Sequence, residues 1–237
     1  MNYDRTRVAF EQTRSVKIPG YLAETYWWAY VHPNAVKVFE RQWLVNLILW
    51  GNFARLRDAA LDALGERVPG RTLQVACVYG DFSQRLAARI APDGWLDVVD
   101  VLPIQLDNLA HKLPYGHGVN MVQSDATALG FPTATYDRAL LFFLLHEMPE
   151  RVRRATLAET LRVVRPGGRV VIVDYHKPHP LNPLFWPMVA ILRTLEPFAM
   201  DLWDAPIETW LPPLPAGARL TRETSFGGLY QRVTIDL

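Results

Sequence analysis

Short apolar runs alternate with amphipathic segments from residue 72 to the end of the chain. Such runs are typical of buried strands, and the segments between them have helical spacing. Strands separated by helices indicate βαβ units and a parallel sheet, in which ligands bind beyond the carboxyl ends of the strands. We predict strands at 73–77, 96–101, 119–123, 136–144 and 169–175, and helices at 83–90, 104–113 and 151–164.

Two further features complete the predicted sheet. Residues 165–168, Arg-Pro-Gly-Gly, are expected to end the helix at 151–164 before the strand at 169–175 begins. Residues 218–224 and 229–237 are predicted to form an antiparallel pair that closes the sheet.

The first 65 residues have the pattern of helices and loops. Asn34 is a candidate N-cap for a long helical stretch from Ala35 to Leu64, with a break or bend near Gly51 and Asn52. The middle of this stretch is apolar nearly all round, which indicates burial or a contact surface. We predict a helical, aromatic-rich extension over residues 1–65 that caps a substrate site, and a ligand-binding domain over residues 66–237.

Composition and charge narrow the classes of partner. The chain has 237 residues, of which 50% are hydrophobic and 21% charged, as expected for a domain with a sizeable core. Its formal net charge of +1 gives no electrostatic case for nucleic acid. The single cysteine, Cys77, excludes an internal disulfide and indicates a reducing compartment.

The sequence predicts a cytoplasmic protein without a membrane-spanning helix. The first residues, MNYDRTRVAFEQ, are polar and lack the apolar core of a secretory signal. No apolar run reaches the roughly 18–20 residues that cross a bilayer. The longest run, Trp43 to Trp50, includes Asn46. The protein is still able to lie against a membrane surface.

Residues 73–83 read as a strand, a tight loop and the start of a helix, the arrangement that wraps a nucleotide-like ligand. This segment resembles the first motif of S-adenosylmethionine (SAM) methyltransferases of the quinone C-methylating type, which carry an acid in the strand and a Gly-x-Gly loop. Here Gln74 stands in place of the acid, Val78 in place of the first glycine, and Gly80 at the second.

The signals that follow keep the register of the same family. Asp100 ends the second predicted strand about 20 residues after the loop, where an acid accepts hydrogen bonds from ribose hydroxyls. Asp125 follows the third strand, where the resemblance implies a bond to the adenine amino group. Phe131-Pro132, Tyr136-Asp137 and residues 164–168 also match. Solvated acids at strand ends are the alternative reading of both aspartates.

The resemblance implies the class I SAM-methyltransferase fold. This is an α/β, Rossmann-like three-layer sandwich with a mostly parallel seven-stranded sheet and an antiparallel C-terminal strand, here with a helical N-terminal extension. Residues 66–237 would then be the SAM-binding domain. The cofactor-binding residues that the resemblance implies are Gln74, Ala76, Val78, Tyr79, Gly80, Asp100, Val101, Asp125 and Ala126.

A narrower resemblance lies in residues 25–33, 39–43 and 174–183 and in the Val78-Tyr79 pair. These look like the rhodoquinone biosynthesis proteins, which replace a ring methoxy group of ubiquinone with an amine, using SAM as amino donor with manganese (Mn²⁺). The resemblance implies ubiquinone as substrate and a cytoplasmic protein held peripherally at the inner membrane. The loop changes point the same way, because Gln74 removes a negative charge and Val78 and Tyr79 add bulk near the methionine end of SAM.

Two other functions stay open at this point. One is an ordinary quinone or small-molecule methyltransferase. The other is a non-catalytic SAM-fold protein that assists quinone biosynthesis.

A second group of candidate residues follows the strand at 169–175. Asp174 and His176 are two positions apart and so share a face, and His179 lies between prolines. Carboxylate and imidazole ligands suit Mn²⁺, so these three are the candidate metal ligands. His176 capping the strand or contacting substrate is the alternative. His146, after the fourth strand, is a comparable candidate, and Tyr79, His146 and His176 are the candidate catalytic residues.

Aromatic residues cluster between positions 21 and 30. Tyr26, Trp27 and Tyr30 are candidates to clamp a quinone ring or to lie at a membrane interface, with core packing as the alternative. Residues 43–50 and 185–188 are candidates to line a channel for an isoprenoid tail, and helices that cover the sheet are the alternative.

Overall fold

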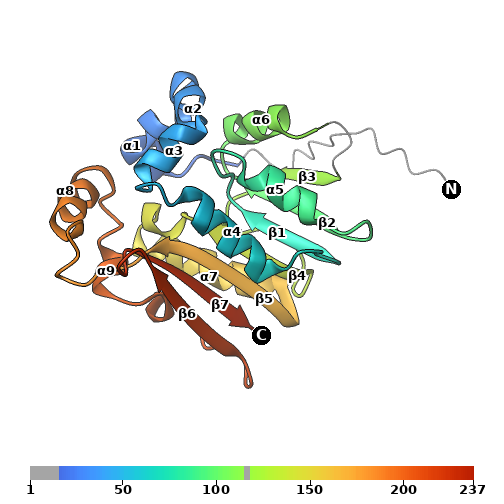
Figure 1. The fold of residues 1–237 in the computed structure, drawn as a ribbon. Helices are drawn as coiled ribbons and strands as arrows, with labels where there is room; N and C mark the ends of the chain where they lie inside the picture. Colours follow the sequence, from blue (N-terminus) through green and yellow to red (C-terminus); the bar gives the residue numbers. More distant parts are fainter. Residues whose placement is uncertain (1–15, 115–117) are drawn as a thin grey trace. The chain divides into compact units, whose positions relative to one another are not determined.

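The computed structural model describes residues 16–114 and 118–237 and divides the chain into two compact units, Met1–Ala126 and Thr127–Leu237 (Figure 1). The strand order of the seven-stranded sheet is β3-β2-β1-β4-β5-β7-β6. The pairs β1–β2, β2–β3 and β4–β5 are parallel, and β7 runs antiparallel to its neighbours β5 and β6. The predicted α/β fold, a mostly parallel seven-stranded sheet with an antiparallel C-terminal strand, is confirmed.

Three parallel strands form the sheet of the first unit. They are β1 (Arg71–Val75), β2 (Trp95–Asp100) and β3 (Val119–Gln123), with β2 in the middle. The side chains of β1 and β2 are buried almost without interruption, as expected for strands covered on both faces. Helix α5 (Phe82–Arg89) follows β1, and α6 (Pro103–Lys112) follows β2.

Within residues 16–70, five helical segments precede β1. They are α1 (Gly20–Thr25), the π-helix η1 (Trp27–Val31), α2 (Pro33–Phe39), α3 (Gln42–Ile48) and α4 (Phe53–Leu64). Helix α4 buries an apolar stripe that includes Phe53, Leu56 and Leu61, whereas α3 buries none of its residues. The buried Arg57 ties α4 to the start of α5, because its Nη1 lies 2.6 Å from Oδ1 of Asp81, the N-cap residue of α5.

The predicted helical stretch from Ala35 to Leu64 is wrong in two respects, the number of breaks and the N-cap. The bend near Gly51 is confirmed, with Gly51 at φ 77°, but a second break separates α2 from α3 at residues 40–41. Asn34 is not the N-cap. His32 is, because its Nδ1 accepts a bond from the Asn34 amide at 3.2 Å, and Pro33 occupies the first helical position, where a missing N–H costs little.

The second unit holds the other four strands. These are β4 (Tyr136–Phe142), β5 (Val164–Tyr175), β6 (Arg219–Ser225) and β7 (Tyr230–Asp236). Strand β7 runs antiparallel to both β5 and β6, which confirms the predicted closing pair. The helical segments of this unit are η2 (Leu145–Glu147), α7 (Glu150–Val163), α8 (Phe185–Leu195), α9 (Asp201–Asp204) and η3 (Ile207–Trp210).

Helix α7 ends at Val163, as predicted from residues 165–168, but the strand that follows begins earlier than the predicted start at 169. Strand β5 begins at Val164, and its pairing with β4 shifts register near Tyr136. The glycines still have a role there. A side chain at Gly168 would approach Val164 Cγ1 to 2.5 Å and the carbonyl oxygen of Asp137 to 2.8 Å, so only glycine fits beside β4.

The boundary between the two units follows Ala126. The helical segments up to residue 65 therefore belong to the same compact unit as β1, β2 and β3. A capping role for residues 1–65 stays a prediction. None of the helices in the described residues is long and apolar enough to span a bilayer.

Candidate functional site

The loop after β1 is held by the acid that ends β2. Asp100 Oδ2 accepts the Cys77 N–H at 2.8 Å, and Oδ1 accepts the Leu102 N–H at 2.9 Å. Burial raises the pKa of Asp100 to about 6, although these backbone donors favour its charged form. A carboxylate oxygen has room for a second hydrogen bond, so Asp100 is able to bind a hydroxyl while it holds the loop.

Asp125 lies at the next strand end in the same unit. Asp100 pairs with Gln123 in the register of β2 and β3, and Asp125 follows two residues later, half-buried. The Ser124 N–H donates to the Asp100 carbonyl oxygen at 3.0 Å, and Gln123 Nε2 donates to that of Val101 at 3.1 Å. The two aspartates therefore come from adjacent carboxyl strand ends, where nucleotide folds bind ribose and base.

Gln74 faces the protein interior rather than the solvent. Its amide nitrogen donates to the Ala76 carbonyl oxygen and to Ser83 Oγ, both at 2.9 Å, and its side chain is almost wholly buried. Ala76 has a positive φ of 72°, a backbone conformation that non-glycine residues rarely adopt. Gln74 thus ties this turn to α5, and a carboxylate in its place has no N–H to donate.

Tyr79 is bound by the N-terminal helices of its own unit. Its hydroxyl donates to the Ala29 carbonyl oxygen at 2.9 Å and accepts from Gln105 Nε2 at 2.8 Å. Its ring stacks on Phe39, with centroids 6.1 Å apart. Tyr79 therefore orders residues 29–39 against the loop, and a catalytic role for it stays a prediction.

Glu40 and Lys112 complete the loop, and sequence reasoning missed both. Glu40 Oε1 accepts the Gly80 N–H at 3.1 Å and lies 2.9 Å from Lys112 Nζ. Lys112 Nζ also donates to the carbonyl oxygens of Val78 and Gly80, at 3.2 and 2.9 Å. Glu40 is in a segment, 39–43, that the sequence singles out only by resemblance, so no local pattern indicates its role.

The aromatic candidates divide between core and surface. Tyr26 is fully buried, which favours core packing over a ligand contact. Trp27 is 52% exposed and lies edge-on to His32, with ring centroids 5.9 Å apart. The side chain of Tyr30 is outside the described part of the structure.

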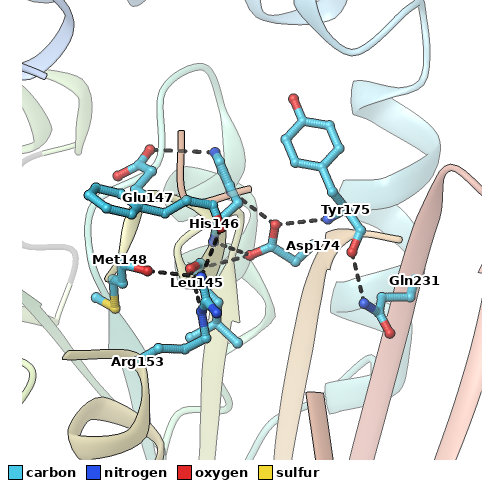
Figure 2. Close-up of polar contacts among 9 residues, drawn as sticks. Leu145, His146, Glu147, Met148, Arg153, Asp174, Tyr175 and Gln231 are labelled. Carbon is cyan, nitrogen blue, oxygen red and sulfur yellow. Dashed lines mark hydrogen bonds and ion pairs between the residues drawn. The ribbon is translucent and has the colours of Figure 1, made fainter. Parts of the chain in front are cut away.

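In the second unit, His146 and Asp174 form a buried pair (Figure 2). His146 Nδ1 lies 2.9 Å from Asp174 Oδ1, and Nε2 lies 3.8 Å from Glu147 Oε1. Burial opposes the charge on His146, but the Asp174 carboxylate outweighs it and raises the pKa of His146 to about 9. His146 is therefore an imidazolium at neutral pH, and it comes from the turn after β4.

The His146 ring lies among aromatic side chains. Its centroid is 4.9 Å from that of Tyr175 and 5.9 Å from that of Phe143, both edge-on. Phe143 has a positive φ of 51°, an uncommon conformation that is found most often where structure serves a site. Burial raises the pKa of Tyr175 well above its usual range, so this phenol stays neutral.

Arg153 supports the turn that carries His146, a role that no local sequence pattern indicates. Its side chain is fully buried on α7, and it donates to the carbonyl oxygens of Leu145 and Met148 at 3.0 and 2.9 Å (Figure 2). It also lies 3.2 Å from Asp201 and stacks on Trp210. These contacts fix residues 145–148 on both sides.

The residues predicted to bind manganese do not fit a metal site. Asp174 already accepts the N–H groups of Leu145, His146 and Tyr175 besides the bond to the His146 ring. His176 Nδ1 lies 2.7 Å from the Gly228 carbonyl oxygen, and His179 Nδ1 accepts the Leu181 N–H. Across residues 16–114 and 118–237, no three His, Cys, Asp or Glu residues group so as to hold a metal ion. The contacts of His176 favour the alternative in which it ties the strand end.

Known proteins similar to this chain share its fold. Residues 72–168 match the family model of a methyltransferase domain. The chain is 32% identical over 146 residues to the ubiquinone/menaquinone biosynthesis C-methyltransferase of Ectopseudomonas mendocina. This match covers 60% of this chain and 55% of that protein. The chain thus spans about half the length of the curated relatives it matches.

Two solved structures agree on the fold. A SAM-dependent methyltransferase from Aquifex aeolicus superimposes with a TM-score of 0.52 and 18% identity, over 87% of this chain and 99% of that one. An N-methyltransferase from Bradyrhizobium japonicum gives a TM-score of 0.53 and 14% identity, over 77% and 94%. The fold is that of class I SAM methyltransferases.

The matched region holds only part of the candidate residues. Gln74, Asp100, Asp125 and His146 lie inside residues 72–168. Asp174, which holds the ring of His146, lies outside it, as do the N-terminal residues that contact the loop.

Proposed function

We propose that this protein is a SAM-dependent transferase that acts on a quinone. The observation that carries the proposal is Asp100, a buried carboxylate at the end of β2 that also holds the loop after β1. An acid in this place binds the ribose hydroxyls in related nucleotide folds. The similarity to quinone C-methyltransferases supports the choice of substrate class.

We propose further that the group transferred is the amine of SAM, which would make ubiquinone into rhodoquinone. The changes that support this lie near the methionine end of the loop, where Gln74 replaces an acid and Val78 and Tyr79 replace a small, flexible turn. The adenosine end keeps Asp100 and Asp125. Changes confined to one half of a cofactor site favour a different reaction there over general loss of binding.

The proposed chemistry balances without a further oxidant. The neutral α-amino nitrogen of SAM attacks the ring carbon that bears the methoxy group, and methanol leaves. The remaining N–H and Cα–H hydrogens then pass, with two electrons, to the quinone, which gives a hydroquinone and an imine. Water hydrolyses the imine, so that the nitrogen stays on the ring and the SAM skeleton leaves as a 2-oxo acid. The product of this sequence is the hydroquinone form of rhodoquinone.

We keep His146 as a candidate general acid for this reaction, because with a pKa of about 9 it is protonated at neutral pH. Asp174 fixes the ring and keeps it charged. Manganese dependence follows only from the family resemblance, and no step here passes through a metal.

The rival function is methyl transfer to a quinone, and labelled SAM separates the two. Purified protein is incubated with ubiquinone and SAM that carries nitrogen-15 in the amino group and carbon-13 in the methyl group. We expect the product, analysed by mass spectrometry, to contain nitrogen-15 and no carbon-13. A product with the methyl label and without the nitrogen label would establish the methyltransferase instead. No product at all, with SAM bound, would favour the accessory protein.

The substrate also implies a place for the protein. Ubiquinone dissolves in lipid, so we propose that the protein works at the cytoplasmic surface of the inner membrane, held peripherally. Exposed tryptophans support this, among them Trp43 on α3 and Trp186 on α8, which are 61% and 74% exposed.

A further inference from the structure

The loop after β1 holds a pair of opposite charges supplied by distant parts of the first unit. Glu40 follows α2 as its C-cap residue, and Lys112 is the last residue of α6. Their carboxylate and ammonium groups lie 2.9 Å apart. Asn108 Nδ2 donates to the other Glu40 oxygen at 2.7 Å.

Both charges also bind the backbone of the loop itself. The carboxylate of Glu40 accepts the Gly80 N–H, and the ammonium of Lys112 donates to two loop carbonyl oxygens. These are the same two groups, carboxylate and ammonium, that the α-carbon of an amino acid carries. The pair is mostly shielded from solvent, with the side chains of Glu40 and Lys112 only 21% and 13% exposed, so each charge interacts strongly with a partner.

The pair lies within reach of the ribose acid. Asp100 binds the loop at Cys77, and Glu40 binds it three residues later, at Gly80. Three residues span at most about 10 Å of extended chain. The amino-acid arm of an adenosine held by Asp100 is therefore able to reach Glu40 and Lys112.

We propose that Glu40 and Lys112 are the residues that bind the amino-acid end of SAM. The SAM carboxylate takes the place of Glu40 on Lys112 and on the Gly80 N–H, and the SAM ammonium bonds to the Glu40 carboxylate. Glu40 thereby places a carboxylate beside the SAM nitrogen from the end of α2 rather than from β1. The ammonium loses its proton before the neutral amine attacks the ring. This inference rests on the SAM binding proposed above.

The test compares two ligands that differ only at this end. S-adenosylhomocysteine has the amino-acid arm, and 5′-methylthioadenosine lacks it. Titration calorimetry measures the affinity of each for the full chain and for the Glu40→Gln and Lys112→Met variants. We expect each variant to bind S-adenosylhomocysteine about tenfold or more weakly, the usual cost of a charged hydrogen bond. The affinity for 5′-methylthioadenosine should stay within about twofold, since this ligand has no amino-acid arm to bond to Glu40 or Lys112.

Control variants keep the result specific. Lys37→Met removes an exposed lysine of α2 and should change neither affinity. Lys112→Arg keeps the charge and should retain the preference for S-adenosylhomocysteine, while thermal melting confirms that each variant is folded.

Three outcomes would overturn the inference. If the variants lose affinity for both ligands equally, the pair only supports the loop. If Glu40→Gln binds S-adenosylhomocysteine more tightly than the parent protein does, Glu40 competes with the ligand. If both variants keep the parent's affinity for both ligands, the pair does not contact SAM. A parent protein that binds neither ligand would refute the proposed function itself, and the inference with it.

Discussion

At the scale of single residues, the loop after β1 depends on the side-chain N–H groups of Gln74, which an acid in the same place would lack. Gln74 Nε2 satisfies the Ala76 carbonyl oxygen and Ser83 Oγ inside a closed core. Ala76 in turn holds a strained backbone conformation. The replacement of an acid by Gln74 therefore changes how the loop is built as well as which charge it presents.

This difference predicts the effect of restoring the acid. Gln74→Glu places a carboxylate against the Ala76 carbonyl oxygen with no N–H to donate, so we expect a loss of unfolding free energy of about 1–3 kcal/mol. The loss should grow as pH rises, because the buried carboxylate is harder to tolerate once it ionises. Urea unfolding at two pH values measures both effects. Ser83→Ala, which removes one of the two bonds, serves as a milder control, and an unchanged or increased stability at high pH would contradict the account.

At the scale of elements, the turn between β4 and α7 is organised around one charge pair. Asp174, from β5, accepts two N–H groups of this turn as well as the His146 ring, while Arg153 binds its carbonyl oxygens from α7. The turn is thus fixed by residues that lie far from it in sequence.

This arrangement predicts how stability depends on pH. The pKa of His146 is about 9 in the folded protein and 6.5 as its ordinary value, so its protonation stabilises the fold fully below about pH 6.5. That contribution, on the order of 1–3 kcal/mol, should be lost as pH rises through 9. Urea unfolding from pH 6 to pH 10 measures it. His146→Gln should show a flatter profile, and His111→Gln, an exposed histidine of α6, should behave as the parent does. Equal slopes in all three proteins would refute the assignment.

The strands were predictable from the sequence, and several helix boundaries were not. Strand β2 is buried along nearly its whole length, and the predicted bounds of β2 and β3 agree with the structure within a residue. Strand β5, in contrast, begins at Val164 and not at 169. The break between α2 and α3 contains no glycine or proline. It coincides with Glu40, whose partners at Gly80, Asn108 and Lys112 are remote in sequence. Long-range contacts of this kind leave no local signal.

The same reason limits what the sequence revealed of the site. Asp100 and Asp125 were found because they end strands, and strand ends are visible in the pattern. The spacing of Asp174 from His176 indicates a shared face, and from this the sequence predicts that Asp174 is a metal ligand. Its bonds to the turn after β4 became visible only in the structure.

At the scale of the whole molecule, two helices expose large apolar side chains to solvent. Helix α3 buries none of its residues and exposes Trp43 and Leu47, at 61% and 64%. Helix α8 in the other unit exposes Trp186 and Leu195, at 74% and 47%. Exposed apolar residues grouped along a helix are typical of contact with a membrane or another partner.

We therefore expect the protein to bind lipid vesicles through hydrophobic contact. In a flotation assay with liposomes it should rise with the lipid and remain bound at high salt, because α3 contains no charged residue. The Trp43→Gln, Leu47→Gln double variant should bind more weakly by about a hundredfold or more, since each buried side chain of this size contributes about 1.5–3 kcal/mol. Trp95→Gln removes a similarly exposed tryptophan at the start of β2, away from both helices in sequence, and should bind as the parent does. Release of the parent protein by salt would mean electrostatic binding, and failure to float would leave α3 as a contact for another partner and remove the membrane from the proposed function.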